Sequence, residues 1–177
     1  MSLESLKAKV GELIEIAKNS SGGGGGDPYE VINSIINGTI TEFYTEEPFN
    51  DSQKNIGYLF NNCGNLTRWA MPNNNINLGA YCFRFCSKLT YIDIGKPPKC
   101  EATLFYGKIL KGASIVIRAE TPPTLTGVFN GTSFDATTAF YVPKASLDAY
   151  KSDTNWSTYA ENFKAIEDYP EITGGVI

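Results

Sequence analysis

The sequence contains no histidine. Histidine is the usual general base at neutral pH, the partner of many nucleophiles, and the commonest metal ligand. The acidic residues that remain form no cluster suited to paired-carboxylate catalysis. Glu46 and Glu47 precede a proline, as do Glu167 and Asp168, and we expect both pairs to be solvated loop charges. The sequence therefore predicts a protein that is not an enzyme and that uses no cofactor and no metal.

Long basic runs and long apolar runs are missing too. The formal net charge is −4 and the lysines and arginines are scattered, so no patch is suited to neutralising phosphates. No apolar stretch approaches the roughly 20 residues that span a bilayer, and residues 1–20 carry charges throughout instead of a signal-peptide core. We expect no nucleic-acid partner, no membrane insertion, and synthesis in the cytoplasm.

Residues 1–20 have the spacing of a coiled-coil helix, with apolar residues at alternating intervals of three and four and charges between them. The apolar seam consists of Leu3, Leu6, Val10, Leu13 and Ala17. Two heptads are too short to be stable alone in water. The sequence therefore predicts a helix for self-association or for anchoring on a larger particle. The alternative is one amphipathic helix packed on its own domain.

Five consecutive glycines follow, within the stretch "NSSGGGGGDP". Such a chain loses too much entropy to be ordered cheaply, so residues 21–27 are predicted to be a flexible linker between two separate bodies. After the linker we expect a short helix at 28–36 and a strand at 39–44.

A repeat occupies the middle of the chain. The segment "YLFNNCGNLTRWAM" (58–71) aligns without gaps on "YCFRFCSKLTYIDI" (81–94), which is a period of 23 residues. Isoleucines at 115 and 117 continue the pattern, and one step back from Leu66 reaches Phe43. A fixed period in the twenties with one short alternating strand per repeat is typical of a solenoid. We therefore predict a mixed α+β solenoid in which equivalent side chains stack in ladders.

The cysteines are predicted to belong to these ladders. Cys63 and Cys86 are equivalent and would stack in the interior as small apolar groups, and Cys82 replaces Leu59 of the preceding repeat. There is no C-x-x-C pair of the kind that binds zinc. A disulfide between Cys82 and Cys86 is the alternative, although a chain made in the cytoplasm does not favour it. Cys100 has no ladder partner in this alignment.

The repeated segments resemble the BspA-like leucine-rich repeat, whose unit follows the pattern AF-x-x-C-x-x-L-x-x-I-x-I. The segments "IRAETPPTL" (117–125) and 140–166 resemble the usual end of such chains, where a Pro-Pro-Thr turn leads to a last strand and two closing helices. We expect Asn155 to cap the second helix, which would bury Trp156, Tyr159 and Phe163. The third repeat departs from the pattern because Gly112 replaces Leu89, so looser stacking is expected there.

The resemblance implies a binding or display module. Such repeats occur on bacterial surface proteins and adhesins and in tail and fibre proteins of phages, and a helix and glycine linker before the repeats are similar to the phage arrangement. We therefore expect a virion-associated fibre, tail or capsid-decoration protein that is assembled in the host cytoplasm. By the same likeness it would be a homotrimer that binds a host-surface protein or glycan, although the seam itself does not exclude a dimer. The alternative is a bacterial cell-surface or soluble protein-binding module.

These expectations divide the chain into five parts. They are an anchoring helix at 1–20, a linker at 21–27, a repeat solenoid at 28–139, a capping strand and helices at 140–168, and a tail at 169–177.

The alternation of the strands also predicts where a ligand would bind. If Trp69 points inward, then Arg68, Tyr91 and Asp93 point out of the sheet, with Arg118 beyond them. This polar and aromatic strip is the candidate ligand face. The alternative is an ordinary solvated sheet face.

Overall fold

The computed structural model describes residues 41–44, 55–57, 60–107, 110–129, 131 and 134–174. The anchoring helix predicted at 1–20, the linker at 21–27 and the helix predicted at 28–36 lie outside these residues. Among the helices that the structure describes, none has the length and apolar character needed to cross a bilayer.

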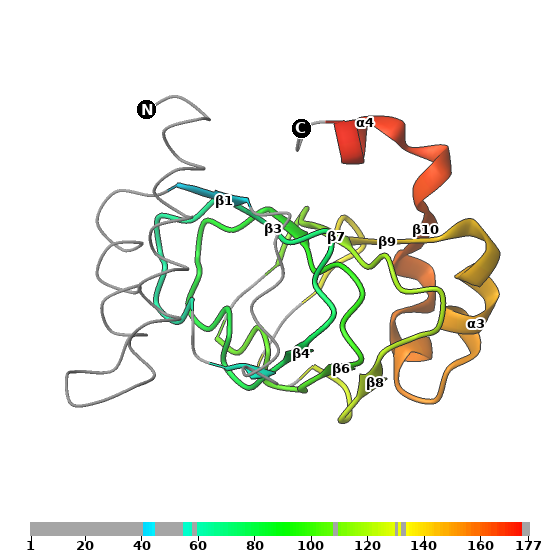
Figure 1. The fold of residues 1–177 in the computed structure, drawn as a ribbon, viewed down its shortest axis with the longest axis horizontal. Coiled ribbons are helices and arrows are strands. Elements are labelled where there is room, and N and C mark those ends of the chain that lie inside the picture. The colour runs from blue at the N-terminus through cyan, green and yellow to red at the C-terminus, as the bar shows by residue number, and fades with distance from the viewer. Residues whose placement is uncertain are drawn as a thin grey trace.

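Six short strands form a parallel sheet along one side of the molecule (Figure 1). They are β1 (Glu42–Tyr44), β3 (Arg68–Ala70), β5 (Tyr91–Asp93), β7 (Ser114–Val116), β9 (Ala139–Val142) and β10 (Phe163–Ala165), which pair in that order. Trp69 pairs with Ile92, and Ile92 pairs with Ile115, as the 23-residue period predicts. Phe43 pairs with Trp69, so its predicted alignment with Leu66 is wrong. The step from β1 to β3 is 26 residues, whereas the next two steps are 23, and the strands pair in spite of this difference.

A second parallel sheet was not predicted. Its strands are β2 (Asn55–Ile56), β4 (Asn77–Leu78), β6 (Lys99–Cys100) and β8 (Thr124–Leu125), paired in that order on the opposite side of the repeats (Figure 1). The expectation of one strand per repeat is therefore wrong, because two-residue strands are too short to show an alternation in the sequence. Cys100 pairs with Leu78 on one side and with Leu125 on the other, so the prediction that it lacks a ladder partner is also wrong.

Aromatic rings run through the core between the two sheets. Phe83 stacks between Phe60 and Phe105, with ring centroids 5.8 and 5.6 Å apart. Phe105 follows Phe83 after 22 residues, so the third repeat is shifted by one position relative to the gapless alignment. Leu110 is fully buried, whereas Gly112 is exposed. Leu110 follows Leu89 after 21 residues and takes the buried place that the gapless alignment gave to Gly112. A shift of one residue at Phe105 and of two at Leu110 thus keeps the core of the third repeat closed, where the sequence predicted looser stacking.

All four cysteines are buried and free, which confirms that Cys63 and Cys86 belong to the wall of the core. The Cys86 thiol donates a hydrogen bond to the Phe60 carbonyl at 3.0 Å. Burial is the main cause that raises the pKa of Cys82 and of Cys100, so these thiols stay protonated and unreactive at neutral pH. No group of metal-ligating side chains exists in the part of the chain that the structure describes.

Serine substitutions at two of these cysteines are expected to have different costs. In Cys100→Ser the new hydroxyl lies among Leu78 and Leu125, so the free energy of unfolding should fall by about 2 kcal/mol. In Cys86→Ser the hydroxyl retains the Phe60 carbonyl as an acceptor, and the loss should be smaller. Urea unfolding at equal m-value measures both. Equal losses would contradict the difference in environment.

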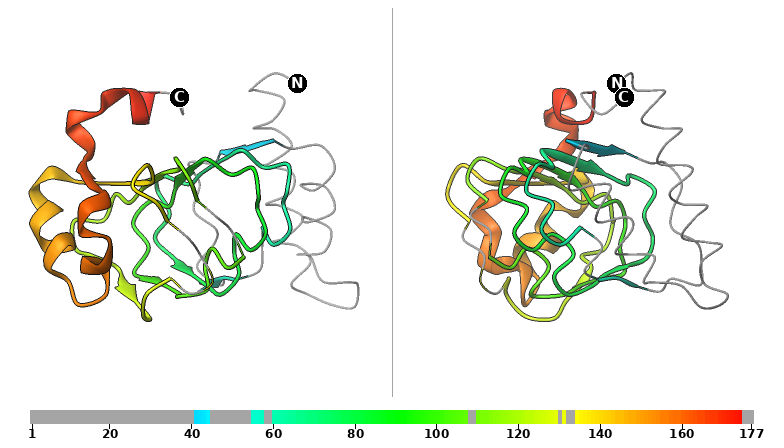
Figure 2. Two further views of the ribbon diagram at one scale, coloured as in Figure 1. Left: turned by 180° about the vertical axis from the view of Figure 1, so that it is seen from behind. Right: turned by 90° about the vertical axis from the view of Figure 1, so that its left-hand side faces the viewer.

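The C-terminal segment closes the last repeat with a cluster of short helices and the strand β10 (Figures 1 and 2). The helical elements are η1 (Lys144–Ser146), α3 (Leu147–Ser152), η2 (Trp156–Asn162), η3 (Ile166–Asp168) and α4 (Pro170–Gly174). The Trp156 indole N–H donates to the Pro123 carbonyl at 2.7 Å, and the Tyr150 hydroxyl donates to the Ala119 carbonyl at 2.9 Å. The cap therefore satisfies carbonyls of the β7–β8 connection as well as covering the apolar core.

Two details of the predicted cap are corrected. Asn155 donates its side-chain amide to the Leu125 carbonyl, while Asp153 accepts the backbone N–H groups of Asn155 and Trp156 at 2.9 and 3.1 Å. Phe163 does not lie on the helix. It begins β10, where it pairs with Phe140 and adds a strand to the sheet.

Candidate ligand-binding surface

The structure brings the four predicted residues of the ligand face together as two pairs. The guanidinium carbon of Arg68 lies 4.3 Å from the centre of the Tyr91 ring. The Nε and Nη2 atoms of Arg118 donate to the same Asp93 carboxylate oxygen at 2.8 and 2.6 Å. Each pair links neighbouring repeats, because β3, β5 and β7 are adjacent in the sheet.

The strip is not open to solvent as predicted. Tyr91 is 5% exposed and Asp93 is fully buried. The reason is a second apolar cluster on the outer face of the sheet, separate from the main core. It consists of Ala70, Tyr91, Val116, Ala139 and Tyr141, with Tyr44, Ile166, Tyr169 and Ile172 packed against them. The alternative prediction, an ordinary sheet face exposed to solvent, is therefore also wrong for this part of the sheet.

Part of the packing on this cluster comes from C-terminal residues that the sequence suggested were a tail. Tyr169 places its ring 5.3 Å from that of Tyr141, and Ile172 of α4 packs on the same cluster. Figure 1 shows α4 beside the strands at this side of the molecule. Residues 169–174 thus belong to the folded domain and occupy the sheet face on which a ligand was expected.

The buried ion pair has a structural role. Burial raises the pKa of Asp93, and the bonds from Arg118 and from the Gly95 N–H at 3.1 Å act in the opposite direction. Burial also raises the pKa of Tyr91, whose hydroxyl has no hydrogen-bond partner among the described residues. Asp93 therefore tethers the Gly95 turn and Arg118 to the sheet, and it offers no free carboxylate oxygen to a ligand.

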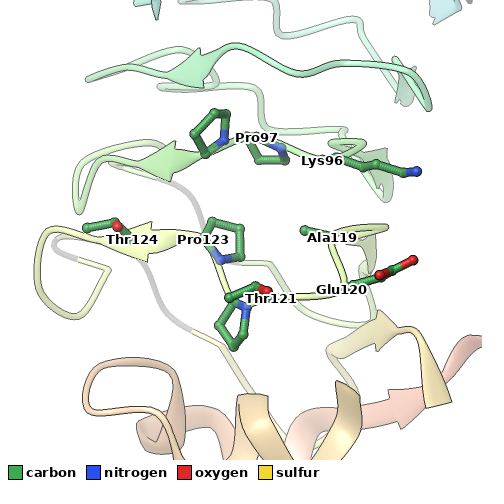
Figure 3. Close-up of a pocket in the computed structure, with 9 residues that line it drawn as sticks. Lys96, Pro97, Ala119, Glu120, Thr121, Pro123 and Thr124 are labelled. Carbon is green, nitrogen blue, oxygen red and sulfur yellow. The ribbon is translucent and has the colours of Figure 1, made fainter. Parts of the chain in front are cut away.

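A groove lies between two neighbouring turns of the chain, and sequence reasoning missed it (Figure 3). Its volume is about 580 Å³, and Pro97 and Pro123 lie on opposite sides of it, with Pro98 and Pro122 also in the lining. The side chains of Lys96 and Glu120 leave the groove on the same side. The Pro-Pro pairs, separated by 25 residues, were the available signal in the sequence.

The chemistry of this groove is limited. Its backbone carbonyls at Ala119, Glu120 and Pro123 accept hydrogen bonds from Tyr150, Ser146 and Trp156 of the cap. The remaining wall offers proline rings and threonine hydroxyls to a partner. The groove is therefore suited to a weak apolar contact, with the charges of Lys96 and Glu120 at one side.

A second surface that sequence reasoning missed lies on the turns that lead from the four-stranded sheet back to the six-stranded sheet. Arg84 lies within 4.5–5.7 Å of the ring centres of Tyr81, Phe85 and Tyr106. Phe85 is 42% exposed and is one of two large apolar side chains that are exposed among the described residues. The signal in the sequence was the repeat alignment itself, in which Phe85 replaces Asn62. We call these four residues the aromatic–arginine edge.

Parallel strands stacked at a nearly constant step, with equivalent side chains in ladders, define a repeat fold. The sequence matches the family described as BspA type leucine rich repeat region, in six copies across residues 42–133. The chain belongs to this family, which implies a protein-binding or adhesin-like role. None of the curated proteins matches the chain.

Proposed function

We propose that the chain is a non-enzymatic, virion-associated phage protein whose leucine-rich repeat solenoid binds a host-surface protein or glycan. The observation that carries the proposal is the heptad spacing of residues 1–20, followed in the sequence by five glycines and then by the repeats. A free helix of this kind would leave a stripe of Leu and Val in water, which soluble monomers seldom do. The seam therefore needs a partner, which we propose to be sister helices, a groove on the particle, or both.

The expected assembly is weak by itself. Two heptads hold sister helices together only marginally, whereas a particle that displays many copies raises their local concentration. We propose a homotrimer as the assembled state. The folded domain supports a display role because its C-terminal cap covers the last repeat and closes the apolar core there.

The test is the double substitution Leu6→Asp and Leu13→Asp. It is expected to abolish self-association or attachment to particles while the melting temperature of the repeat domain stays the same. The matched control is Ser5→Asp with Ala8→Asp, which adds the same charge outside the seam. Oligomeric mass from sedimentation and the melting curve are measured on the full chain. Unfolding of residues 27–177 by the double substitution would show that the helix packs on its own domain.

That outcome would favour the second candidate, a bacterial cell-surface or soluble protein-binding module. The observation in its favour is the family itself, whose repeats imply an adhesin-like role without any particle. The neighbouring genes separate the two candidates, because genes for tail or capsid proteins on either side are expected only for a virion protein.

A further inference from the structure

The aromatic–arginine edge is built from two successive turns of the repeat. Tyr81 and Tyr106 meet edge to face with ring centroids 5.6 Å apart. The Phe85 ring lies directly on Gly107, where a β-carbon would come within 2.3 Å of the ring. The Tyr106 ring lies on Gly131 in the same way, at 2.6 Å. The rings are thus seated on glycines of the following turn, and any larger residue at 107 or 131 would displace them.

Phe85 occupies a position that does not suit a bulky residue. Asn62, Phe85 and Gly107 hold equivalent places in successive turns, with φ values of 63°, 57° and 75°. Asn62 and Phe85 donate the same turn-to-turn backbone hydrogen bond, to the carbonyls of Arg84 and Tyr106. Asparagine and glycine adopt this left-handed backbone at little cost, whereas a phenylalanine there is strained. Because much of its side chain is also exposed, burial does not offset the strain, which is the pattern expected of a functional residue.

The positively charged guanidinium of Arg84 lies against these rings. Its Nε atom is buried and has no hydrogen-bond partner, and none of the ion pairs among the described residues includes Arg84. The three rings stabilise the guanidinium through their faces and keep it partly out of water. A partly dehydrated guanidinium without a carboxylate is a site for an anion, and its planar fork fits a carboxylate.

We propose that the aromatic–arginine edge binds a carboxylated saccharide, a polymer of uronic-acid type, through Arg84 and Phe85. This inference rests on the proposed binding role of the repeat domain and is independent of the particle anchor. The sugar carboxylate would pair with the Arg84 guanidinium, and the apolar C–H face of the same sugar ring would lie on the exposed Phe85 ring.

Two features favour a sugar over an acidic peptide. A uronic acid carries its carboxylate directly on a sugar ring whose C–H groups are positively polarised. One sugar residue can therefore pair with the Arg84 guanidinium and also lie on the negative face of the Phe85 ring. An Asp or Glu side chain brings a carboxylate on a flexible stem and has no such face. The edge offers one guanidinium and one exposed ring, so the affinity of a single site should be weak, on the order of 1 mM, and rise with multivalent display.

The test uses three probes on the full chain: a galacturonic acid trisaccharide, galactotriose of the same linkage, and a triglutamate peptide. Binding is measured by titration in solution at fixed salt. The acidic trisaccharide should bind at least about tenfold more tightly than the neutral one or the peptide. Phe85→Asn, which restores the residue of the preceding turn, and Arg84→Gln should each weaken this binding at least about tenfold. Phe85→Asn should not lower the melting temperature.

Lys88→Gln is the matched control, since it removes one exposed cation from the same turn. It should leave binding unchanged. Equal binding of all three probes, equal loss in Lys88→Gln, or tighter binding of triglutamate would overturn the proposal. If the wild-type chain attaches to host cells and Phe85→Asn attaches equally well, the binding role stands and the edge is not its site. If the wild-type chain attaches to no host surface while the trisaccharide binds as expected, the site stands and the host-binding function fails.

Discussion

Replacement of Trp69 with alanine is expected to lower the free energy of unfolding by about 4 kcal/mol. Trp69 is fully buried in β3, where its ring stacks on Phe43 and meets the edges of Phe60 and Phe83 at 5.6 and 4.9 Å. Alanine would leave a cavity among rings that are fixed by their own stacking and cannot easily move to fill it. The substitution therefore removes contacts between three repeats at once.

Trp69→Phe is the informative control. The indole Nε1 atom of Trp69 is buried and has no hydrogen-bond partner among the described residues. Phenylalanine retains most of the ring and removes this unsatisfied donor, so the two effects oppose each other and the net loss should be below about 1 kcal/mol. Urea unfolding of both variants gives the comparison. A large loss in Trp69→Phe, or a small loss in Trp69→Ala, would mean that Trp69 does not fill the core as described.

The strand positions of the repeat were predictable because they depend on alternation within one segment. Trp69, Ile92 and Ile115 were placed in register by a gapless alignment, and the structure pairs them in that way. The alignment failed between β5 and β7, where the step is 22 residues at Cys100 and Phe105, 21 at Leu110, and 23 again at Ile115. Strands can stay paired when the segment that connects them changes in length, and an alignment with a fixed period cannot describe that change in length.

The candidate ligand face illustrates a different limit. Its four residues are neighbours, as the alternation predicted, but alternation says only that Tyr91 and Asp93 leave the core side of the sheet. They are covered by Arg68 and Arg118, and the apolar cluster on this face is extended by Tyr169 and Ile172, which are distant in sequence. Two apolar residues close to the C-terminus gave no periodic signal from which this packing could be inferred. The aromatic–arginine edge was, by contrast, visible in the alignment as the replacement of Asn62 by Phe85.

The ion pair between Arg118 and Asp93 gives the second large expected effect, a loss of stability that depends on pH. In Arg118→Met the Asp93 carboxylate, which is fully buried, loses the guanidinium that contacts it at 2.6 and 2.8 Å. At pH 8 the expected loss is about 3 kcal/mol, because a buried charge is left with only the Gly95 N–H as a donor. The methionine side chain replaces the apolar stem of the arginine, so the substitution removes the charge and keeps most of the packing.

The sign of the pH dependence follows from the pKa of Asp93, which burial holds above its ordinary value in the folded chain. A raised folded pKa means that the protonated carboxyl favours the folded state. This contribution is complete below the ordinary pKa and is lost as the pH rises through the folded one. Removing Arg118 raises the folded pKa of Asp93 further, so Arg118→Met should be only slightly less stable than the wild type at pH 4 and much less stable at pH 8.

The control is Asp93→Asn combined with Arg118→Met, which should remove most of this difference between the two pH values, because no buried carboxyl is left to ionise. Tyr91, Arg68 and Tyr44, which also act on this site, are unchanged in all variants. An equal loss at both pH values would show that Arg118 contributes through the packing of its stem and not through its charge.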